Sequence, residues 1–154
     1  MSLQSVRDFF AQHAPDLEVL VLDRSTATVA EAAEGHGVEP GQIAKTLSLR
    51  VGERVVLVVA NGTARLDNKK AKAAFGGKVK MLDLAEVEVI TGHPIGGVCP
   101  FAVKPGVEIC CDASLNAYEE VIPAAGAPNA AVRINPQRMA ELTGAKWVDV
   151  CEQR

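Results

Sequence analysis

The sequence predicts a single α+β domain built on a strongly curved sheet that is mixed or largely antiparallel. Three observations predict this class. The chain has 154 residues, enough for one domain with a substantial core. Several strand-like segments follow one another without a helix between them, so the strict alternation of a doubly wound sheet fails. The sequence contains no internal repeat, low-complexity tract or linker, and the domain is therefore expected to span residues 1–154.

The predicted elements follow from apolar periodicity and from turn residues. In chain order they are a helix at 2–16, a strand at 17–23, a helix at 26–37, two strands within 39–62, a helix at 67–77, a strand at 78–82, a helix at 83–92, strands at 107–115, 118–126 and 130–135, a helix at 135–145 and a strand at 146–152. The first helix carries Val6, Phe9 and Phe10 on one side and ends near Pro15.

Capping residues bound the later helices. Thr28 is the predicted N-cap of the second helix, and Gly35 or Gly37 ends that helix. Asp67 begins the third helix and Gly76 ends it. These signals are local, so they predict where each helix begins and ends but not how it packs.

The third and last helices carry further signals. Ala71, Ala74 and Phe75 fall on one face of the third helix, which leaves its lysines directed outward. Asn135 is the expected N-cap of the last helix, with Pro136 at the first helical position.

Lys45 occupies an unusual place in the first strand of the 39–62 pair. The two-residue period of a strand puts Lys45 on the apolar face that Ile43, Leu47 and Leu49 share. A lysine there is costly to bury unless it snorkels at a strand edge or serves a site. Both alternatives stay open, and a register shift of one residue would move Lys45 to solvent. The second strand, VVLVVA at 55–60, is apolar on both faces and is expected in the sheet centre.

A glycine- and proline-rich segment at 91–106, TGHPIGGVCPFAVKPG, fits neither a helix nor a strand. Glycines let the backbone approach a ligand closely, and their N–H groups can hold an anion or a developing oxyanion. Pro94 and Pro100 would stiffen the segment and limit the entropy lost on binding. The segment is therefore a candidate binding loop, and a purely structural Ω-loop is the alternative.

Cysteine and histidine spacing favours no metal site or catalytic triad. No CxxC pair, phosphate-binding P-loop or GxSxG motif is present, and the histidines lie far apart. Adjacent Cys110 and Cys111 would point to opposite faces of a strand. The cysteines are expected to be buried thiols; a thiol-redox protein using Cys110 and Cys111 is an alternative. The residues concerned are Cys99, Cys110, Cys111, Cys151, His13, His36 and His93.

The charge of the chain is uneven. The formal net charge is −3, which argues against general nucleic-acid coating. The segment 65–80 is nevertheless basic and contains only one acid, Asp67. A local basic patch suits a partner with one phosphate-bearing segment, although a solvated lysine face is equally consistent with it. The basic residues of the segment are Arg65, Lys69, Lys70, Lys72, Lys78 and Lys80.

The sequence also carries an expectation about location. No apolar run approaches the roughly 18 residues needed to cross a bilayer. The amino terminus lacks the basic start and apolar middle of a signal peptide. We therefore expect a cytoplasmic protein without a membrane partner.

Four segments together resemble one family. GQIAKTL, NGTARLDNKKAKAAFG, TGHPIGGVCPF and RINPQRMAELTGAKWVDV occur in the order and spacing of the YbaK/ProX family of aminoacyl-tRNA deacylases, which is related to the editing domain of bacterial prolyl-tRNA synthetases. The resemblance covers nearly the whole chain. It implies one editing domain with a mixed α/β fold on a curved, barrel-like sheet surrounded by helices.

The resemblance also implies site residues. The lysine matching Lys45 is the main functional side chain of the family, and the loop matching Gly96 to Pro100 lines its aminoacyl pocket. The expected substrate-binding residues are therefore Thr46, His93, Gly96, Gly97, Val98, Cys99 and Pro100. The expected tRNA-binding residues are Arg65, Lys69, Lys70 and Lys72. No cofactor and no metal are expected.

The implied reaction is hydrolysis of the ester that joins a small mischarged amino acid to tRNA, most simply proline tRNA, in trans. The chain offers no evident nucleophile or base, so water or a substrate hydroxyl would attack while Lys45 anchors a phosphate or carbonyl and stabilises charge. A covalent role for Cys99 is disfavoured, because the resemblance requires no thiol there. The expected partners are the acceptor end of aminoacyl-tRNA and prolyl-tRNA synthetase; a non-catalytic tRNA- or synthetase-binding module is the alternative.

One segment departs from the family. Members that act on cysteinyl-tRNA tend to carry a serine in a glycine-rich turn, and here the turn reads PAAGAPN at 123–129. Alanines at these positions put cysteine specificity in doubt. They favour alanine or a short non-protein analogue as the amino acid removed.

Overall fold

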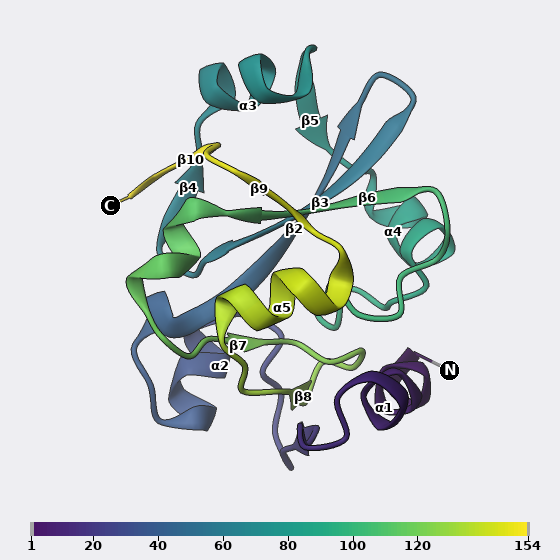
Figure 1. The fold of residues 1–154 in the computed structure, drawn as a ribbon, viewed down its shortest axis with the longest axis vertical. Helices are drawn as coiled ribbons and strands as arrows, with labels where there is room; N and C mark the ends of the chain where they lie inside the picture. The colour runs from purple at the N-terminus through teal and green to yellow at the C-terminus, as the bar shows by residue number, and fades with distance from the viewer. Residues whose placement is uncertain (1, 154) are drawn as a thin grey trace.

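The computed structural model describes residues 2–153 and has the predicted α+β fold (Figure 1). Its helices are α1 (Ser2–His13), α2 (Val29–His36), α3 (Asn68–Phe75), α4 (Leu84–Thr91) and α5 (Pro136–Thr143), with short 3-10 helices at Pro40–Gln42 and Ala113–Ala117. Its strands are β1 (Leu20–Val21), β2 (Ile43–Val51), β3 (Arg54–Asn61), β4 (Ala64–Leu66), β5 (Val79–Met81), β6 (Val107–Asp112), β7 (Ile122–Pro123), β8 (Ala130–Ala131), β9 (Lys146–Val148) and β10 (Cys151–Gln153). No helix among these residues is long and apolar enough to cross a membrane.

The main sheet is mixed and open. Its strand order is β5-β2-β3-β6-β9, and β7 pairs with β2 in addition. The β2–β3 and β2–β5 pairs are antiparallel, whereas β3–β6, β6–β9 and β2–β7 are parallel. β3 lies in the centre and is buried along its length after Arg54, as the apolar run at 55–60 predicts. The expected barrel-like closure does not occur, because β5 and β9 remain separate edges.

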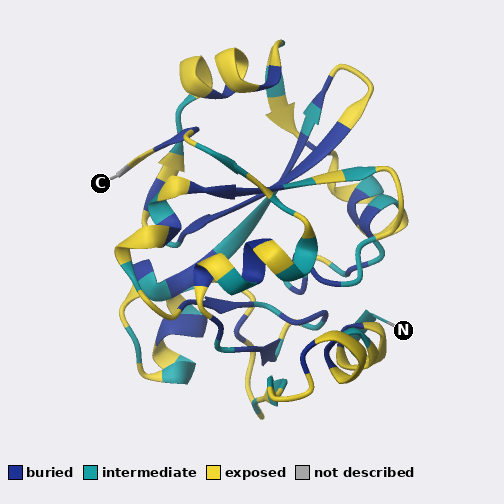
Figure 2. Cartoon of the chain, viewed as in Figure 1, coloured by how far each residue is buried: buried dark blue, intermediate teal, exposed yellow. Residues whose placement is uncertain are grey.

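The two faces of the sheet carry separate cores. On one face, α1, α5 and the glycine-rich segment pack over residues such as Val59 and Cys111. On the other face, α3, β4 and β10 cover residues such as Val58 and Cys110. Adjacent Cys110 and Cys111 thus point into opposite layers, as predicted. Figure 2 shows the helices with exposed outer faces and buried inner faces around this sheet.

The helix boundaries follow the predicted caps. Thr28 and Glu31 form a reciprocal capping box at the start of α2, and Gly37, with φ 68°, ends that helix; Gly35 lies inside it. Asp67 accepts hydrogen bonds from two backbone N–H groups of α3, and Asn135 does the same for α5. These caps form because they need only residues within one turn of the helix.

The prediction for the inner face of α3 was wrong at one residue. Ala71 and Phe75 are buried, but Ala74 is exposed. The helix is only eight residues long. Its contact stripe is narrow and runs through the i and i+4 positions, which leaves Ala74 at the solvent edge.

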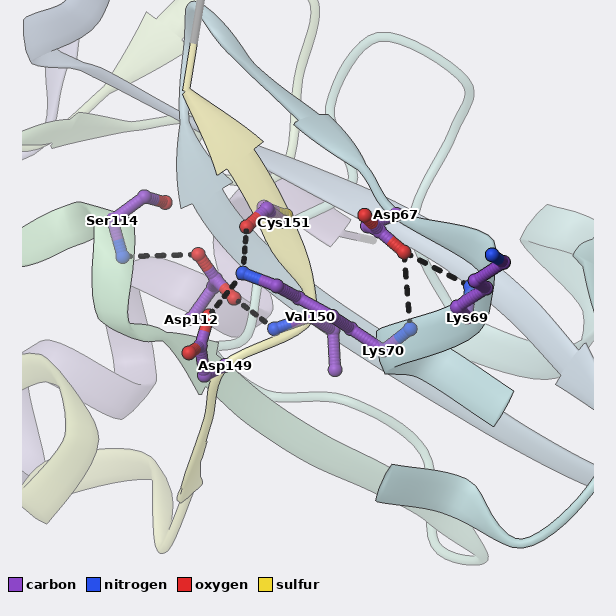
Figure 3. A network of polar contacts seen from close by, with 8 residues as sticks. All are labelled: Asp67, Lys69, Lys70, Asp112, Ser114, Asp149, Val150 and Cys151. Atoms are coloured by element: carbon purple, nitrogen blue, oxygen red, sulfur yellow. Dashed lines mark hydrogen bonds and ion pairs between the residues drawn. The ribbon is translucent and has the colours of Figure 1, made fainter. Parts of the chain in front are cut away.

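The predicted carboxy-terminal strand at 146–152 is two strands, β9 and β10, separated by Asp149 and Val150. The buried carboxylate of Asp112 accepts hydrogen bonds from the backbone N–H groups of Val150 at 2.8 Å and Ser114 at 2.9 Å (Figure 3). This anchor turns the chain, so that β10 leaves the main sheet and pairs with β4. Neither β4 nor the turn was predicted from the sequence.

The other predicted strands are shorter than expected. The strand expected at 107–115 ends at Asp112, which begins a 3-10 helix. The three expected at 17–23, 118–126 and 130–135 form only the two-residue strands β1, β7 and β8. β1 pairs with β8, while β7 pairs with β2. We call the region of β7 and β8 the β7–β8 layer, and it forms one side of a cavity.

Candidate functional site

A cavity of about 240 Å³ lies at an open stretch of the β2 edge. β7 pairs with Ile43 and Ala44 at the start of β2, and β5 pairs with Leu49 to Val51 at its end. Between these two pairings, β2 has no strand partner on this edge. The gap admits Thr46 and Ser48 into the cavity wall.

The open edge supplies polar groups to an otherwise apolar cavity. Residues of an antiparallel strand alternate between bonding to one neighbour and pointing to the other edge. The backbone polar groups of Ser48 point away from β3, because the Ser48 carbonyl accepts a hydrogen bond from Leu82 N at 2.9 Å. Thr46, two residues earlier, has the same orientation. Its side-chain Oγ1 is buried and has no hydrogen-bond partner among residues 2–153, which is a costly arrangement for a polar group.

Apolar side chains form most of the remaining wall, and a group of alanines forms one end of it. Ala27, just before α2, and Ala32 within α2 lie there, with Ala124, Ala130 and Ala131 of the β7–β8 layer. Ala124 belongs to the PAAGAPN turn, which therefore does line the cavity. The methyl groups leave room for a small ligand group, and the hydroxyls of the flanking Thr26 and Thr28 already donate hydrogen bonds within the protein.

Lys45 lies on the wall of the cavity, on the apolar strand face predicted from the sequence. Its side chain is half-buried, and its Nζ donates hydrogen bonds to the backbone carbonyls of Gly62, at 3.3 Å, and Ala64. Burial lowers the pKa of the Lys45 ammonium from its usual value, and the positive charge of Arg65 adds to this effect. Two of its three N–H donors are thus engaged, which leaves one for a ligand.

The glycine-rich segment contributes fewer residues to the cavity than expected. Gly96 and Val98 line it, whereas Gly97, Cys99 and Pro100 are buried outside it. Gly97 is structural: a Cβ there would lie 2.6 Å from the backbone N of Ala127. Its N–H is engaged as well, by the Pro94 carbonyl at 2.9 Å.

His93 lies behind the loop and does not line the cavity, although it was expected to bind substrate. Its Nε2 donates to the Phe101 carbonyl at 2.7 Å, so Nδ1 accepts from the hydroxyl of Ser2. Burial lowers the pKa of this imidazole, while the Phe101 carbonyl opposes that shift. His93 thus ties the loop to the start of α1. The sequence could not reveal this, because Ser2 is remote in the chain.

The cysteine thiols are poorly reactive. All four cysteines are buried and free. Burial raises the pKa of Cys99 to about 12, that of Cys110 to about 11 and that of Cys111 to about 12. At neutral pH these groups are neutral thiols, which are poor nucleophiles.

We expect Cys99→Ala to leave turnover close to wild type and to lower stability by about 1 kcal/mol, because the thiol fills core space outside the cavity. Steady-state kinetics and thermal unfolding check this. The native cysteines should also resist a thiol reagent until the protein unfolds. Loss of turnover in a variant of unchanged stability would show instead that the Cys99 thiol takes part in chemistry.

The basic residues form an exposed surface beside the cavity. Arg65 lies on β4, Lys69, Lys70 and Lys72 on α3, and Lys78 and Lys80 at β5, and all are exposed. Lys70 is partly engaged, since its Nζ contacts Asp149 at 3.3 Å and the Cys151 carbonyl at 3.2 Å (Figure 3). These residues lie outside the cavity. We refer to Arg65, Lys69, Lys70, Lys72, Lys78 and Lys80 as the basic patch.

Sequence reasoning missed Ser48, the alanines of α2 and β8, and the residues at the cavity mouth. Only one signal could have found any of them: Thr46 and Ser48 place two hydroxyl groups on one face of a strand whose other face is mostly apolar. The walls from α2 and β8 depend on chain packing and have no local signature.

Comparison with known proteins agrees with this geometry. A profile described as "Aminoacyl-tRNA editing domain" matches residues 23–142. YwhH of Bacillus subtilis (strain 168), named an uncharacterized protein, is 45% identical over 154 residues, which are 99% of this chain and 98% of that protein. EbsC of Enterococcus faecalis (strain ATCC 700802 / V583), named a candidate Cys-tRNA(Pro)/Cys-tRNA(Cys) deacylase, is 33% identical over 121 residues, or 77% of this chain and 73% of EbsC.

The crystal structure of a candidate trans-editing enzyme for prolyl tRNA synthetase matches with a TM-score of 0.89 at 35% identity, over 98% of this chain and 97% of that chain. The agreement thus extends over the whole fold as well as the sequence. The protein described here belongs to the aminoacyl-tRNA editing domain family.

Proposed function

We propose that this protein hydrolyses the ester between a small amino acid and the terminal ribose of a mischarged tRNA, most simply proline tRNA. The observation that carries the proposal is the open edge of β2, where Thr46 and Ser48 join Lys45 in the wall of a small, mostly apolar cavity. Such an edge suits a group with a polar carbonyl and a short apolar side chain. An aminoacyl ester has this composition.

The cavity can hold both ends of the aminoacyl group. The alanine-lined end receives the amino-acid side chain. At the open edge, the backbone N–H groups of Thr46 and Ser48 are the proposed donors to the ester carbonyl. Because Gly97 N–H is already bonded to Pro94, the strand edge replaces the glycine loop as the expected donor of these hydrogen bonds.

The reaction needs no protein nucleophile. Either a water oxygen attacks the ester carbonyl directly, or a ribose hydroxyl attacks it first and water follows. In each attack, the bond between the carbonyl carbon and the ribose oxygen breaks, and that ribose oxygen takes up a proton. Lys45 stabilises the negative charge that develops on the carbonyl oxygen or anchors the terminal phosphate. The products are a free amino acid and an uncharged tRNA.

The amino acid is expected to be small and unreactive. Size is a weak discriminator, since one methylene in an apolar pocket is worth about 1–3 kcal/mol. The alanine at position 124 offers no polar partner to a thiol or hydroxyl. Alanine or a short non-protein analogue is therefore the preferred substrate, with cysteine the competing choice that the name of EbsC suggests.

One assay tests the proposal. The purified protein is incubated with proline tRNA charged with alanine, cysteine or proline, and loss of the ester is followed over time. We expect rapid loss of the small mischarged amino acid and little loss of proline. A protein that binds these tRNAs but releases no amino acid would be a non-catalytic binding module, and the proposal would be wrong.

We also expect the basic patch to guide the tRNA acceptor stem. Changing Lys69 and Lys72 together to Glu should raise KM, flatten its salt dependence and spare kcat, because both side chains lie outside the cavity. Each lost phosphate contact should lower the log–log salt slope by about 0.7–0.9. Lys69 and Lys72 are better choices than Lys70, which contacts Asp149.

The matched control changes Lys104 and Lys146, two exposed lysines outside the basic patch, to Glu. It alters the net charge equally. If both double variants raise KM alike, the effect reflects overall charge and the basic patch is a solvated surface. Prolyl-tRNA synthetase is a further proposed partner, because the similar crystal structure is described as that of a candidate trans-editing enzyme for that synthetase.

A further inference from the structure

Three exposed apolar side chains surround the mouth of the cavity. Met81 is 60% exposed, Leu84 69% and Ile95 57%, and all three line the cavity. They come from β5, the start of α4 and the glycine-rich segment, so the chain brings them together only on folding. We call these three residues the apolar rim. Large apolar side chains gathered at the mouth of a cavity are typical of a binding surface.

The charges around the apolar rim differ from one side to the other. Lys78 and Lys80 are exposed on the β5 side, and α3 packs beside β5 (Figure 1). On the α4 side, Asp83 and Glu88 are exposed. A phosphate chain that leaves the cavity would therefore pass over β5 towards the basic patch and away from α4.

We propose that the apolar rim binds the face of the terminal nucleobase of the tRNA. This inference rests on the proposed function: with the aminoacyl group in the cavity, the ribose lies at the mouth, and the base attached to that ribose must lie against the surface just outside. A base presents a flat apolar face to such a surface. Met81 suits this contact, because its flexible, polarizable side chain packs well against aromatic rings.

The charge pattern favours a nucleotide over a protein on this surface. On one side, exposed lysines lie next to the apolar rim. A single-stranded acceptor end needs both features, because its base stacks on an apolar surface and its phosphate backbone binds cations. A second copy of the chain would bring the same lysines together and repel itself. Self-association is therefore an outcome of the test below and not the proposal.

The test compares two small esters that differ only in the base. One is the 2′(3′)-alanyl ester of adenosine, and the other is the 2′(3′)-alanyl ester of methyl riboside, which keeps the ribose hydroxyl groups. The wild-type protein should prefer the adenosine ester in kcat/KM by about tenfold, the order expected for one stacked base. Met81→Ser combined with Leu84→Ser should abolish that preference, chiefly through a higher KM for the adenosine ester.

The matched control is Val89→Ser. Val89 is 70% exposed on α4 but does not line the cavity, so its replacement should leave the base preference unchanged. Thermal unfolding of all variants checks the fold, and because the side chains changed are exposed we expect little shift. A wild-type protein without base preference, or a double variant that keeps it, overturns the inference while the proposed function stands.

Two further outcomes are distinguishable. If sedimentation shows that the wild-type protein self-associates and the double variant does not, with base preference unchanged, the apolar rim is an interface between copies and the inference is wrong. If the wild-type protein hydrolyses neither ester nor any mischarged tRNA, the proposed function fails, and the inference fails with it.

Discussion

Lys45→Ala is expected to lower deacylation by about 100-fold or more, the loss typical of removing one group that stabilises transition-state charge. Lys45 supplies positive charge at the cavity wall, where burial strengthens its interaction with a developing negative charge. Its ammonium is held in place by the carbonyls of Gly62 and Ala64. The loss should appear in kcat with saturating mischarged tRNA.

Lys45→Arg should also lose most activity. A planar guanidinium is larger than an ammonium and cannot place one compact donor between two carbonyls and the substrate. Lys146→Ala, at an exposed lysine on β9, is the matched control and should behave as wild type. Circular dichroism and thermal unfolding establish whether each variant is folded. A folded Lys45→Ala variant with near wild-type turnover would show that Lys45 has no catalytic role.

The second large effect is expected from Gly96→Ala. Gly96 has φ 87°, and a Cβ there would lie 2.9 Å from the Cβ of Ala27, which also lines the cavity. The added methyl group would therefore push the loop and the start of α2 apart. We expect a loss of kcat/KM of at least about tenfold, because displacement of a binding wall by even one ångström costs up to about 100-fold in rate.

Backbone strain alone does not account for this expectation, and the chain offers a control. Gly106 has φ 90°, but a methyl group added there would meet no atom within 4 Å among the described residues, so Gly106→Ala carries the same strain without the contact. Gly106→Ala should lose about 1–2 kcal/mol of stability from strain and Gly96→Ala more, because of the added contact, but only Gly96→Ala should lose activity. Adding Ala27→Gly to Gly96→Ala removes the contact and should restore part of the activity. Equal activity of the two single variants would show that Gly96 has only a structural role.

Some of the site was predictable because its signals are short-range or periodic. The two-residue period of β2 placed Lys45 on the apolar face that Leu47 and Leu49 share, and the structure confirms that register. The glycine and proline content of residues 91–106 marked the loop, of which Gly96 and Val98 do line the cavity. Gly97, Cys99 and Pro100 lie outside the cavity wall, because the composition of a loop does not determine which of its sides faces the core. Substrate binding by these residues stays a prediction.

His93 and Cys99 show this limit clearly. Both lie beside cavity-lining residues in the sequence, yet both are fully buried against Phe101 and α1. Both side chains contact the Phe101 carbonyl, and the Phe101 ring packs against Phe9 and Phe10 of α1, with ring centroids 6.0 and 4.7 Å away. No local rule identifies which residues of a loop a distant helix will cover.

The sequence by itself determined the α+β class, the central place of β3, the helix caps at Thr28, Asp67 and Asn135, and the apolar face of Lys45. Each depends on residues within a few positions, through capping hydrogen bonds or a repeat of two or 3.6 residues. Only the tertiary structure decided that β5 and β7 stop short of each other along β2. That gap opens the cavity, leaves the Thr46 hydroxyl without a partner among residues 2–153 and brings the apolar rim to its mouth, because strand pairing joins segments that are remote in the chain.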